Sequence, residues 1–583
     1  MLITESHEIA ECFNNHFLKV ATNLQSSRTN QAISNSDFPF LFTNHISQNF
    51  FIFPVTPDEL YQKIQSLKNK SSSGVDEVNS IVIKKVAINL VDVLCYIINK
   101  SFETGIFPNS LKTALVIPIF KKGDPNNPDN YRPISLVSVF SKIIESCMKS
   151  RLINFLQKHK FLSDCQFGFR EKLNTEDALI QLLNQVYSAL NVSDESAVNF
   201  IDIKKAFDTV DFEILLKKLN YSGIRGVSNN WFRSYLIGRD QTVKISKISS
   251  TTGRLTAGVP QGTVLGPILF LVYLNSIFDL KLNGSFVAFA DDMAIFYRDA
   301  SQNTITQKIN EDLRKLKEWF DLHSMVMSNK TKLMRFKVKE NNLPGKVEYH
   351  CSTCYTKGNT YVTPLLSCPN SCFEIECVEE FKYLGVILDS KLNFKKHVEG
   401  LRKYVVFCNR QMYELRSKCP NSVLIDFYYG LIQSRLQYGI SCWGGTYLNT
   451  IKPILIAQKF IMRTMFKKTR YTSSLPLFKS NNILPIRYLY IYKVLKIFFL
   501  RSGNRNIKVT KYMLRNKSNC PKPQSWKESF RRYFLATSPM LYNKLPEEIK
   551  NITLLSGFLR EVRAWLFSFN EVNAVETLLR VTL

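Results

Sequence analysis

The sequence predicts a mixed α/β (α+β) fold followed by a mostly helical, basic C-terminal region. Between residues 109 and 335, strand-like apolar runs alternate with segments of helical periodicity. Beyond Phe381 the apolar residues recur almost entirely at helical spacing. The 583 residues suffice for several compact units. A composition of 45% hydrophobic and 12% aromatic residues excludes a disordered or collagen-like chain.

The first part of the chain predicts a helix and a linker ahead of the main body. Apolar residues recur at helical spacing from Glu8 to Leu24, and a Ser- and Asn-rich linker follows over residues 26–37. We therefore treat residues 1–50 as a separate N-terminal region. From Val55 to Lys121, two helical stretches flank a turn-forming loop at residues 71–76.

Four apolar runs in the body, residues 51–340, predict strands: 114–120, 197–203, 286–290 and 333–338. The apolar stretch 264–278 predicts a buried helix, because Tyr273 and Asn275 interrupt it and a membrane span needs about 20 apolar residues. The N-terminus lacks the basic and apolar regions of a signal peptide. We therefore expect an intracellular protein, in the nucleus and cytoplasm, without a membrane partner.

A Cys-rich insertion follows at residues 341–380. A structural Zn²⁺ takes four sulfur or nitrogen ligands, commonly from closely spaced pairs of residues. The candidate zinc ligands are Cys351, Cys354, Cys368 and Cys372. The second pair is spaced more widely than in the usual zinc ribbon, so a variable hairpin with reduced cysteines is the alternative.

The C-terminal part, residues 381–583, predicts helices over 401–415, 423–438 and 451–466. Residues 401–583 contain 31 Lys and Arg against 8 Asp and Glu, so they carry most of the chain's net charge of +29. Basic and aromatic residues are interleaved at 466–471 and 530–533. Spaced cations bind phosphate backbones and exposed rings stack on bases, which predicts a nucleic-acid partner. A solvated basic surface and an acidic membrane lipid are the alternatives.

Acidic residues occur at two positions next to apolar strands. Asp202 lies near the end of the run 197–203, and the pair Asp291 and Asp292 begins 89 residues later, between two apolar runs. Buried, unpaired carboxylates are strongly unfavourable unless a cation compensates them. Mg²⁺ binds carboxylate and phosphate oxygens, and two such ions can hold both reacting oxygens of a phosphoryl transfer. By itself, the Asp pair also fits an ordinary surface hairpin turn.

Other segments contain residue types that phosphoryl transfer would require. A glycine-punctuated loop at residues 258–267 opens a helix and allows close backbone approach to a ligand. Lys121, Lys122 and Arg132 place cations on loops around a strand, which suits a triphosphate. Phe207 lies five residues beyond Asp202, where its ring could lie under a sugar.

The order and spacing of these motifs resemble the reverse transcriptase of non-LTR (LINE-type) retrotransposons, jockey-like elements in particular, from about Phe51 to the end. The matching segments are 107–108, 130–136, 166–170, 200–208, 258–267, 289–292, 329–332, 382–385, 438–444 and 541–546. The resemblance implies a right-hand polymerase with fingers and palm in residues 51–340 and a thumb within 381–583. It further implies an RNA-directed DNA polymerase that uses two Mg²⁺ ions, with Mn²⁺ as a substitute. The implied partners are template RNA, a DNA primer or nicked target DNA, and dNTPs.

The resemblance also implies roles for individual residues. Asp202, Asp291 and Asp292 would be the metal-binding triad of the palm. Asp292 is expected to be the looser member because adjacent strand residues point to opposite faces. Ile203 would contribute its backbone carbonyl to a metal. Lys330 resembles a basic residue suggested as proton donor to departing pyrophosphate, with an ordinary surface lysine as the alternative. The implied nucleotide-binding residues are Lys121 or Lys122, Arg132, Ile203, Gln261, Gly262 and, at the 2′ position of the sugar, Phe207.

The sequence departs from the family in one domain. Full-length relatives begin with an apurinic-type endonuclease, and no arrangement of Asp, His, Glu and Asn before Phe51 replaces it. We therefore expect no endonuclease activity in this chain. A catalytically degenerate, nucleic-acid-binding remnant of a mobile element is the main alternative, followed by a host-domesticated protein or a group II intron-type maturase. The intact carboxylates favour an active polymerase.

Overall fold

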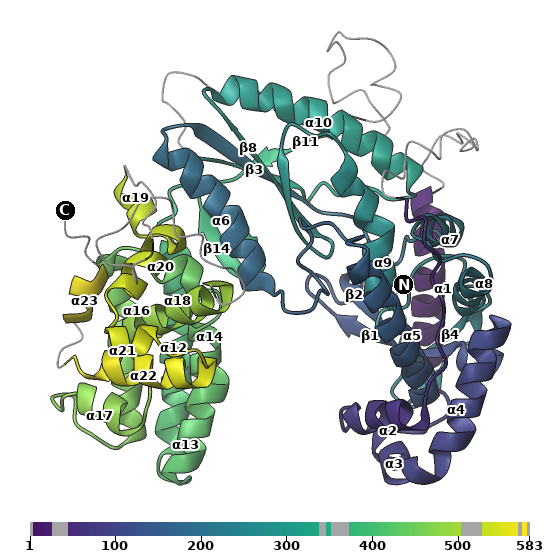
Figure 1. Ribbon diagram of the computed structural model, residues 1–583, viewed down its shortest axis with the longest axis horizontal. Coiled ribbons are helices and arrows are strands. Elements are labelled where there is room, and N and C mark those ends of the chain that lie inside the picture. The colour runs from purple at the N-terminus through teal and green to yellow at the C-terminus, as the bar shows by residue number, and fades with distance from the viewer. Residues whose placement is uncertain are drawn as a thin grey trace.

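The computed structural model describes residues 4–25, 45–336, 345–350, 372–502, 520, 527–569 and 574–579. Two lobes lie on either side of a central β-sheet, and the long helix α10 (Gln302–Leu322) covers this sheet (Figure 1). One lobe contains the N-terminal elements and the other contains the C-terminal helices. The mixed α/β class expected from the sequence is confirmed. The linker expected over residues 26–37 lies outside the described residues.

The N-terminal sheet has the strand order β2-β1-β4-β5, with β6 also paired to β4. Its strands are β1 (Thr113–Phe120), β2 (Tyr131–Leu136), β4 (Asp240–Ile245), β5 (Ile248–Ser249) and β6 (Gly253–Arg254). Helix α1 (Ser6–Gln25), which matches the helix expected over residues 8–24, packs on this sheet. The Asn14 amide donates to the Thr251 backbone oxygen at 2.9 Å and accepts from Gln241 at 3.1 Å. The N-terminal helix therefore belongs to the same folded body as the sheet.

The central sheet has the strand order β12-β9-β3-β8-β7. Its strands are β3 (Glu195–Ile201), β7 (Ser285–Phe289), β8 (Asp292–Asp299), β9 (Lys332–Phe336) and β12 (Glu376–Cys377). Every residue of β3 is buried, because both faces of the sheet are covered. Ala197 and Ile201 pack into one hydrophobic core with α10, whereas Val198 and Phe200 pack into a second core with α6 (Thr175–Asn191). This alternation follows from the period of two in a strand.

The apolar stretch 264–278 forms α9 (Gly266–Leu274) and the 3₁₀ turn η4 (Asn275–Asp279). Nearly every residue of α9 is buried, so the buried helix expected from the sequence is confirmed. Within the described ranges, no helix combines the length and apolar character that a membrane crossing would need. The other long helices of this part are α2 (Pro57–Ser66), α4 (Ala87–Thr104), α5 (Val139–Lys158), α7 (Phe212–Tyr221) and α8 (Val227–Leu236).

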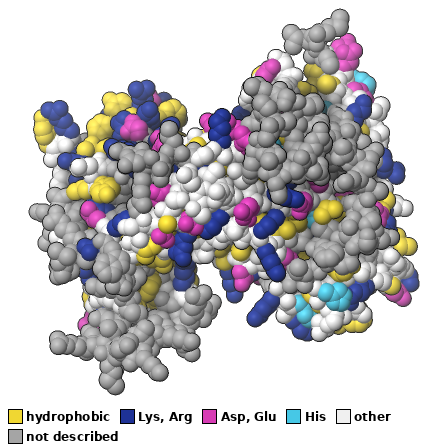
Figure 2. All heavy atoms as spheres, turned by 90° about the horizontal axis from the view of Figure 1, so that it is seen from above, with side chains coloured by type: hydrophobic (Ala, Val, Ile, Leu, Met, Phe, Trp, Pro, Cys, Tyr) yellow, Lys and Arg dark blue, Asp and Glu magenta, His cyan; other side chains and the backbone are white. Residues whose placement is uncertain are grey.

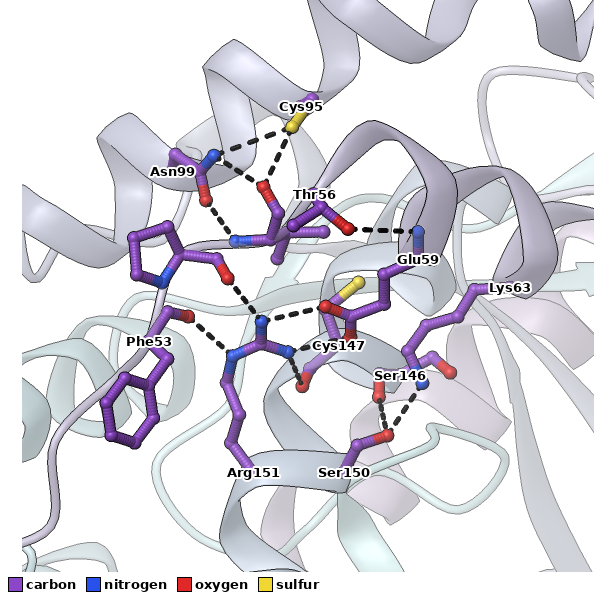
Figure 3. Close-up of polar contacts among 12 residues, drawn as sticks. Phe53, Thr56, Glu59, Lys63, Cys95, Asn99, Ser146, Cys147, Ser150 and Arg151 are labelled. Atoms are coloured by element: carbon purple, nitrogen blue, oxygen red, sulfur yellow. Dashed lines mark hydrogen bonds and ion pairs between the residues drawn. The ribbon is translucent and has the colours of Figure 1, made fainter.

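A polar cluster ties the segment before α2 to helices α4 and α5 (Figure 3). Arg151 on α5 donates to the backbone oxygens of Phe53 at 2.6 Å and Pro54 at 2.8 Å, and it forms an ion pair with Glu59 at 2.9 Å. The hydrogen bonds from Arg151 lower the pKa of Glu59. Asn99 on α4 binds the backbone N–H and C=O of Val55 at 2.7 and 2.9 Å. These bonds satisfy backbone groups of a segment that lies outside regular secondary structure.

The C-terminal lobe is helical, as the spacing of apolar residues predicts. Its main elements are the hairpin β13 (Glu380–Tyr383) and β14 (Val386–Asp389) and the helices α12 (Lys395–Leu415), α13 (Asn421–Phe427), α14 (Ser434–Leu436), α15 (Ile440–Trp443), α16 (Leu448–Met465), α18 (Ile486–Ser502), α20 (Phe534–Asn543) and α22 (Leu555–Phe567). The helix expected over 423–438 is interrupted by a π-helical turn, η6 (Tyr428–Gln433).

The C-terminal lobe is attached to the central sheet through α6. The Ser441 hydroxyl donates to the buried Glu176 carboxylate at 2.5 Å, and the Tyr533 hydroxyl donates to the Ile180 backbone oxygen at 2.7 Å. The C-terminal helices also share one hydrophobic core with α6 and one face of the sheet. This shared core fixes the C-terminal lobe to the elements that carry the acidic residues.

Candidate active site

Asp202 directly follows β3 and is half-buried. Its backbone is held by the segment between α10 and β9: Ser328 N–H donates to the Asp202 oxygen at 2.7 Å, and Asp202 N–H donates to Thr331 Oγ1 at 3.2 Å. Ile203 forms an isolated antiparallel bridge with Met327. The residues on either side of Ile203 make the backbone hydrogen bonds of this bridge, so the Ile203 carbonyl points away from Met327.

Asp291 lies in the turn that joins β7 to β8. Phe289 pairs with Asp292, so the turn consists of Ala290 and Asp291, one residue earlier than a turn centred on the two aspartates. Ala290 has a φ of +56°, which is uncommon for a residue other than glycine. Asp291 is half-buried, whereas Asp292 is exposed at the start of β8.

The three aspartates lie close enough to influence one another electrostatically. Partial burial and the charge of Asp202 raise the pKa of Asp291. Partial desolvation of its carboxyl group and the charges of Asp291 and Asp202 raise the pKa of Asp292 to about 6, although the residue as a whole is exposed. Lys121 and Arg132 lower both of these pKa values, so they face the same carboxylates. The structure therefore brings together residues that lie far apart in the chain.

The donor set of this cluster fits a hard divalent cation. Carboxylate and carbonyl oxygens are the ligands that Mg²⁺ prefers. Desolvation, and then the charges of the neighbouring aspartates, raise the pKa values of Asp291 and Asp292, and a bound cation would favour their ionised forms. In the described part of the chain, no three His, Cys, Asp or Glu side chains are already arranged around one metal position.

Basic residues approach the aspartates from the β1–β2 hairpin and from the loop before β9. Partial burial and the charges of Arg132 and Lys330 lower the pKa of Lys121, while Asp202 raises it. Lys121 N–H donates to the Asn130 oxygen at 2.8 Å, which closes the hairpin. The structure therefore places Lys121 and Arg132 near the aspartates and Lys330 near Lys121. Lys121 and Lys122 are both exposed.

The glycine-punctuated loop lies against β2 and against the segment after Asp202. Ser135 N–H donates to the Gln261 backbone oxygen at 2.7 Å, and the Gln261 amide donates to Asp208 at 2.9 Å. Burial raises the pKa of Asp208 to about 6. Gly262 has a φ of +114°, and a Cβ there would lie 2.6 Å from the Ser135 oxygen, so a side chain at this position would clash. Asp208 was not singled out by sequence analysis, although it lies within the segment 200–208.

Phe207 is half-buried and held from two sides. Its ring stacks on Phe270 of α9, with centroids 4.2 Å apart, and meets Phe169 edge-on at 6.3 Å. Its backbone oxygen accepts a hydrogen bond from Val259 N–H at 2.9 Å. The ring therefore has a defined position beside the glycine-punctuated loop.

Sequence analysis missed Glu145, which supports the same loop. This buried residue of α5 accepts backbone hydrogen bonds from Val264 at 2.7 Å and Leu265 at 3.0 Å, at the start of α9. It also accepts a hydrogen bond from the Tyr235 hydroxyl at 3.1 Å. A carboxylate at a helix N-terminus is favourable because it meets unpaired N–H groups. A single Glu among apolar residues gave no signal of this role.

The zinc prediction concerns mostly residues outside the described part of the chain. Cys351, Cys354 and Cys368 lie there, and Cys372 is described, directly before β11 (Phe373–Glu374). Strand β11 pairs with β10 (Glu348–Tyr349), which brings the two ends of the insertion together. Zinc binding stays a prediction.

Comparisons with known proteins find sequence similarity over the region that contains the three aspartates. Residues 119–388, which include the three aspartates, match the family described as reverse transcriptase (RNA-dependent DNA polymerase). The chain is 28% identical over 507 residues to a probable RNA-directed DNA polymerase from transposon BS of Drosophila melanogaster, covering 83% of this chain and 52% of that protein.

Two other relatives come from similar elements. The chain is 27% identical to a probable RNA-directed DNA polymerase from transposon X-element of Drosophila melanogaster, over 71% of this chain and 44% of that protein. It is 28% identical to the RNA-directed DNA polymerase from mobile element jockey of Drosophila funebris, over 68% of this chain and 43% of that protein. The chain spans about half the length of the curated relatives it matches. It carries a reverse transcriptase domain and is related to the RNA-directed DNA polymerases of the BS, X-element and jockey transposons.

Proposed function

We propose that this chain is an RNA-directed DNA polymerase that copies retrotransposon RNA by extending a DNA primer. The observation that carries the proposal is the electrostatic cluster of Asp202, Asp291 and Asp292 with Lys121 and Arg132, inside the matched reverse transcriptase domain. The central sheet then corresponds to the palm, the N-terminal sheet and its helices to the fingers, and the C-terminal helices to the thumb.

The aspartates and the Ile203 carbonyl would hold two Mg²⁺ ions, for which Mn²⁺ is a substitute. Bound divalent cations would stabilise the charge that develops during an in-line phosphoryl transfer. The chain supplies the framework: Asp202 is fixed by backbone bonds to residues 328 and 331, and Asp291 by the β7–β8 turn. A fixed framework orients the reacting groups before reaction and lowers the cost of reorganisation.

Lys121, with Lys122 beside it, and Arg132 would hold the triphosphate of the incoming dNTP. Desolvation and the nearby charges of Arg132 and Lys330 lower the pKa of Lys121, and a polyanionic triphosphate would offset the repulsion among these cations. Arg132 can bind phosphate oxygens through two N–H groups at once. Lys330, exposed on the loop before β9, would donate a proton to departing pyrophosphate.

Gln261, Gly262 and Phe207 would position the base and sugar of the dNTP. The absence of a Cβ at Gly262 lets the backbone approach β2 closely, and Asp208 orients the Gln261 amide. The Phe207 ring, supported by Phe270, would exclude the 2′-hydroxyl of a ribonucleotide.

The basic C-terminal region would bind template RNA and the primer–template duplex. Lys467 and Lys468 are exposed, and the Arg470 guanidinium lies 4.7 Å from the ring centre of Tyr471, whose surface is 80% exposed. On the face shown in Figure 2, Lys and Arg side chains lie near the middle, interspersed with Asp and Glu side chains. Such cations and exposed rings bind phosphates and unstacked bases.

Primer extension with the purified chain tests the proposal. Oligo(dT) annealed to poly(rA), with dTTP and Mg²⁺, should yield extended primer, and Asp202→Asn should abolish extension while leaving primer–template binding intact. Extension by neither protein, with binding by both, would support the degenerate, nucleic-acid-binding alternative. Equal extension by both proteins would contradict the site.

A further inference from the structure

A buried glutamine contacts the turn that carries Asp291. Gln166 lies in the segment between α5 and α6, and only 1% of its surface is exposed. Its Oε1 accepts the N–H of Ala290 at 2.8 Å, and its Nε2 donates to the Ala290 carbonyl at 3.2 Å. One side-chain amide thus binds both backbone polar groups of the residue before Asp291.

The segment around Gln166 runs alongside β7. Phe167 N–H donates to the Ala288 oxygen at 2.8 Å, and Ala288 N–H donates to the Cys165 oxygen at 2.8 Å. The Gln166 Oε1 also accepts the N–H of Gly168 at 2.8 Å. A Cβ at Gly168 would lie 2.3 Å from the Ala290 nitrogen, so only glycine allows this approach. The segment therefore reaches the turn beside β7 through a single parallel bridge between Gln166 and Ala288.

The conformation of Ala290 explains why the turn needs such support. In a two-residue hairpin turn, the positive φ is normally supplied by glycine or asparagine. Alanine in the left-handed region costs about 1–2 kcal/mol, and such residues persist where the surrounding structure determines them. Here the φ of +56° at Ala290 coincides with two hydrogen bonds to Gln166, one donated by Ala290 N–H and one accepted by the Ala290 carbonyl.

We propose that Gln166 is a positioning residue that holds the Ala290–Asp291 turn in the conformation needed to bind metal. It acts through the backbone of Ala290 and touches neither substrate nor metal. The consequence for metal binding rests on the proposed polymerase function. The two hydrogen bonds between Gln166 and Ala290, which form the clamp, are a property of the metal-free protein. The two can therefore be tested separately.

The test compares Gln166→Met with a matched control, Gln302→Met. Methionine is similar in length to glutamine but cannot replace its hydrogen bonds. Gln302 is also buried, and its amide donates to the backbone oxygens of Ser196 and Phe336, both at 3.3 Å. These contacts lie at the end of β3 and β9 remote from Asp202. The control thus removes a buried amide on α10 that contacts the same sheet without touching the turn.

Amide hydrogen exchange of the metal-free proteins measures directly how firmly the clamp holds the turn. In Gln166→Met, the peptide covering residues 286–293 should exchange about tenfold faster or more, because opening of the turn no longer breaks two hydrogen bonds. In Gln302→Met, exchange of this peptide should match the parent protein. Equal exchange in Gln166→Met and parent would overturn the proposal even if the chain is an active polymerase.

The Mg²⁺ dependence of primer extension, and its rescue by a second substitution, measure the consequence for metal binding. Gln166→Met should raise the Mg²⁺ concentration for half-maximal primer extension about tenfold, with primer–template affinity unchanged, because a mobile Asp291 binds metal less well. Adding Ala290→Gly should recover part of this loss, since glycine adopts the turn without strain. An unchanged Mg²⁺ requirement in an active Gln166→Met, or an equal increase in Gln302→Met, would contradict the positioning role.

A second substitution keeps the test decisive if Gln166→Met does not fold. Gln166→Glu preserves size and both accepted hydrogen bonds. At alkaline pH, where the buried carboxyl group is ionised, it places a carboxylate oxygen in place of the donor to the Ala290 carbonyl. Exchange of the turn should accelerate in this variant while peptides of β3 keep the parent rate. If exchange in the turn stays at the parent rate, the clamp is not what holds it. A parent chain without polymerase activity would refute the proposed function and leave the exchange result standing.

Discussion

The ring of Phe207 lies on the ring of Phe270, with centroids 4.2 Å apart and planes inclined by 21°. Phe270 is fully buried in α9, and Glu145 caps the start of that helix. The position of the Phe207 ring is thus fixed through α9 by the same carboxylate that supports the glycine-punctuated loop. The Phe207 ring is therefore held in one position. Steric exclusion of the 2′-hydroxyl of a ribonucleotide requires such a fixed side chain.

Phe207→Val should increase ribonucleotide incorporation relative to deoxynucleotide incorporation by about tenfold or more, because it removes the bulk facing the 2′-hydroxyl. The ratio of kcat/KM for rUTP and dTTP on the same primer–template measures this. Phe270→Leu is the matched control, since it loosens the support and should change the ratio less while lowering the melting temperature. An unchanged ratio in a folded Phe207→Val would show that Phe207 is only a core aromatic.

Asp202→Asn and Asp291→Asn should each lower the primer-extension rate by about a thousandfold or more, a loss of at least about 4 kcal/mol of transition-state stabilisation. Asp292→Asn should have a smaller effect, because Asp292 is the more exposed of the pair. Asp92→Asn, which changes an exposed carboxylate on α4, is the control. Single-turnover rates at saturating primer–template measure the relative effects of the three substitutions. More than a tenth of the parent rate in Asp202→Asn would contradict the assignment of Asp202 as a metal ligand.

Metal binding should weaken in acid because protons and metal compete for the same carboxylate. The pKa of Asp292 is raised to about 6, so in the metal-free protein this group becomes protonated as the pH falls through that value. Mg²⁺ affinity should therefore fall below about pH 6, by up to tenfold per pH unit for one displaced proton.

Calorimetric titration of the metal-free protein in buffers of different ionisation enthalpy measures both the affinity and the proton release. For this group alone, the metal-free fold gains stability at acidic pH and loses it as the pH rises through about 6. Asp292→Asn should release fewer protons on metal binding near pH 6, because this carboxyl group is absent. Equal proton release by Asp292→Asn and parent near pH 6 would assign the proton to another group.

Primer–template binding by the full chain should weaken steeply with salt, because bound cations displace counterions from the phosphates. Replacing both Lys467 and Lys468 by Gln should reduce the slope of log affinity against log salt by about one to two. Fluorescence anisotropy between low and physiological salt measures the slope. Replacement of Lys85, an exposed lysine on α3 (Ser80–Lys85), is the control. A slope unchanged by the double substitution would show that segment 466–471 is not part of the primer–template interface.

Glu59→Gln should lower the stability at neutral pH by about 1–2 kcal/mol, because it weakens the ion pair with Arg151. The pKa of Glu59 is lowered in the fold. Its contribution is therefore present above the unfolded pKa and is lost as the pH falls through the folded pKa. The difference in melting temperature between variant and parent should shrink as the pH falls below about 4. A difference that does not change with pH would show that the charge of Glu59 is not what stabilises this cluster.

The sequence by itself determined the strands and the residues they carry. The runs 114–120 and 286–290 correspond to β1 (Thr113–Phe120) and β7 (Ser285–Phe289). Such runs can be read locally, because alternation and apolar character are encoded in consecutive residues. The order of Asp202, the glycine-punctuated loop and the Asp291–Asp292 pair was also sufficient to indicate the reverse transcriptase family, which the comparisons support.

Only the tertiary structure decided which distant groups support the site. Gln166 and Ala290 are 124 residues apart, and Glu145 and Leu265 are 120 residues apart. Local periodicity encodes the faces of helices and strands, but not which buried polar group will meet which backbone amide. The turn illustrates this: its sequence contains no glycine at position 290, so turn chemistry alone does not predict a positive φ there. That conformation is stabilised by hydrogen bonds from a side chain that only the folded chain brings to it.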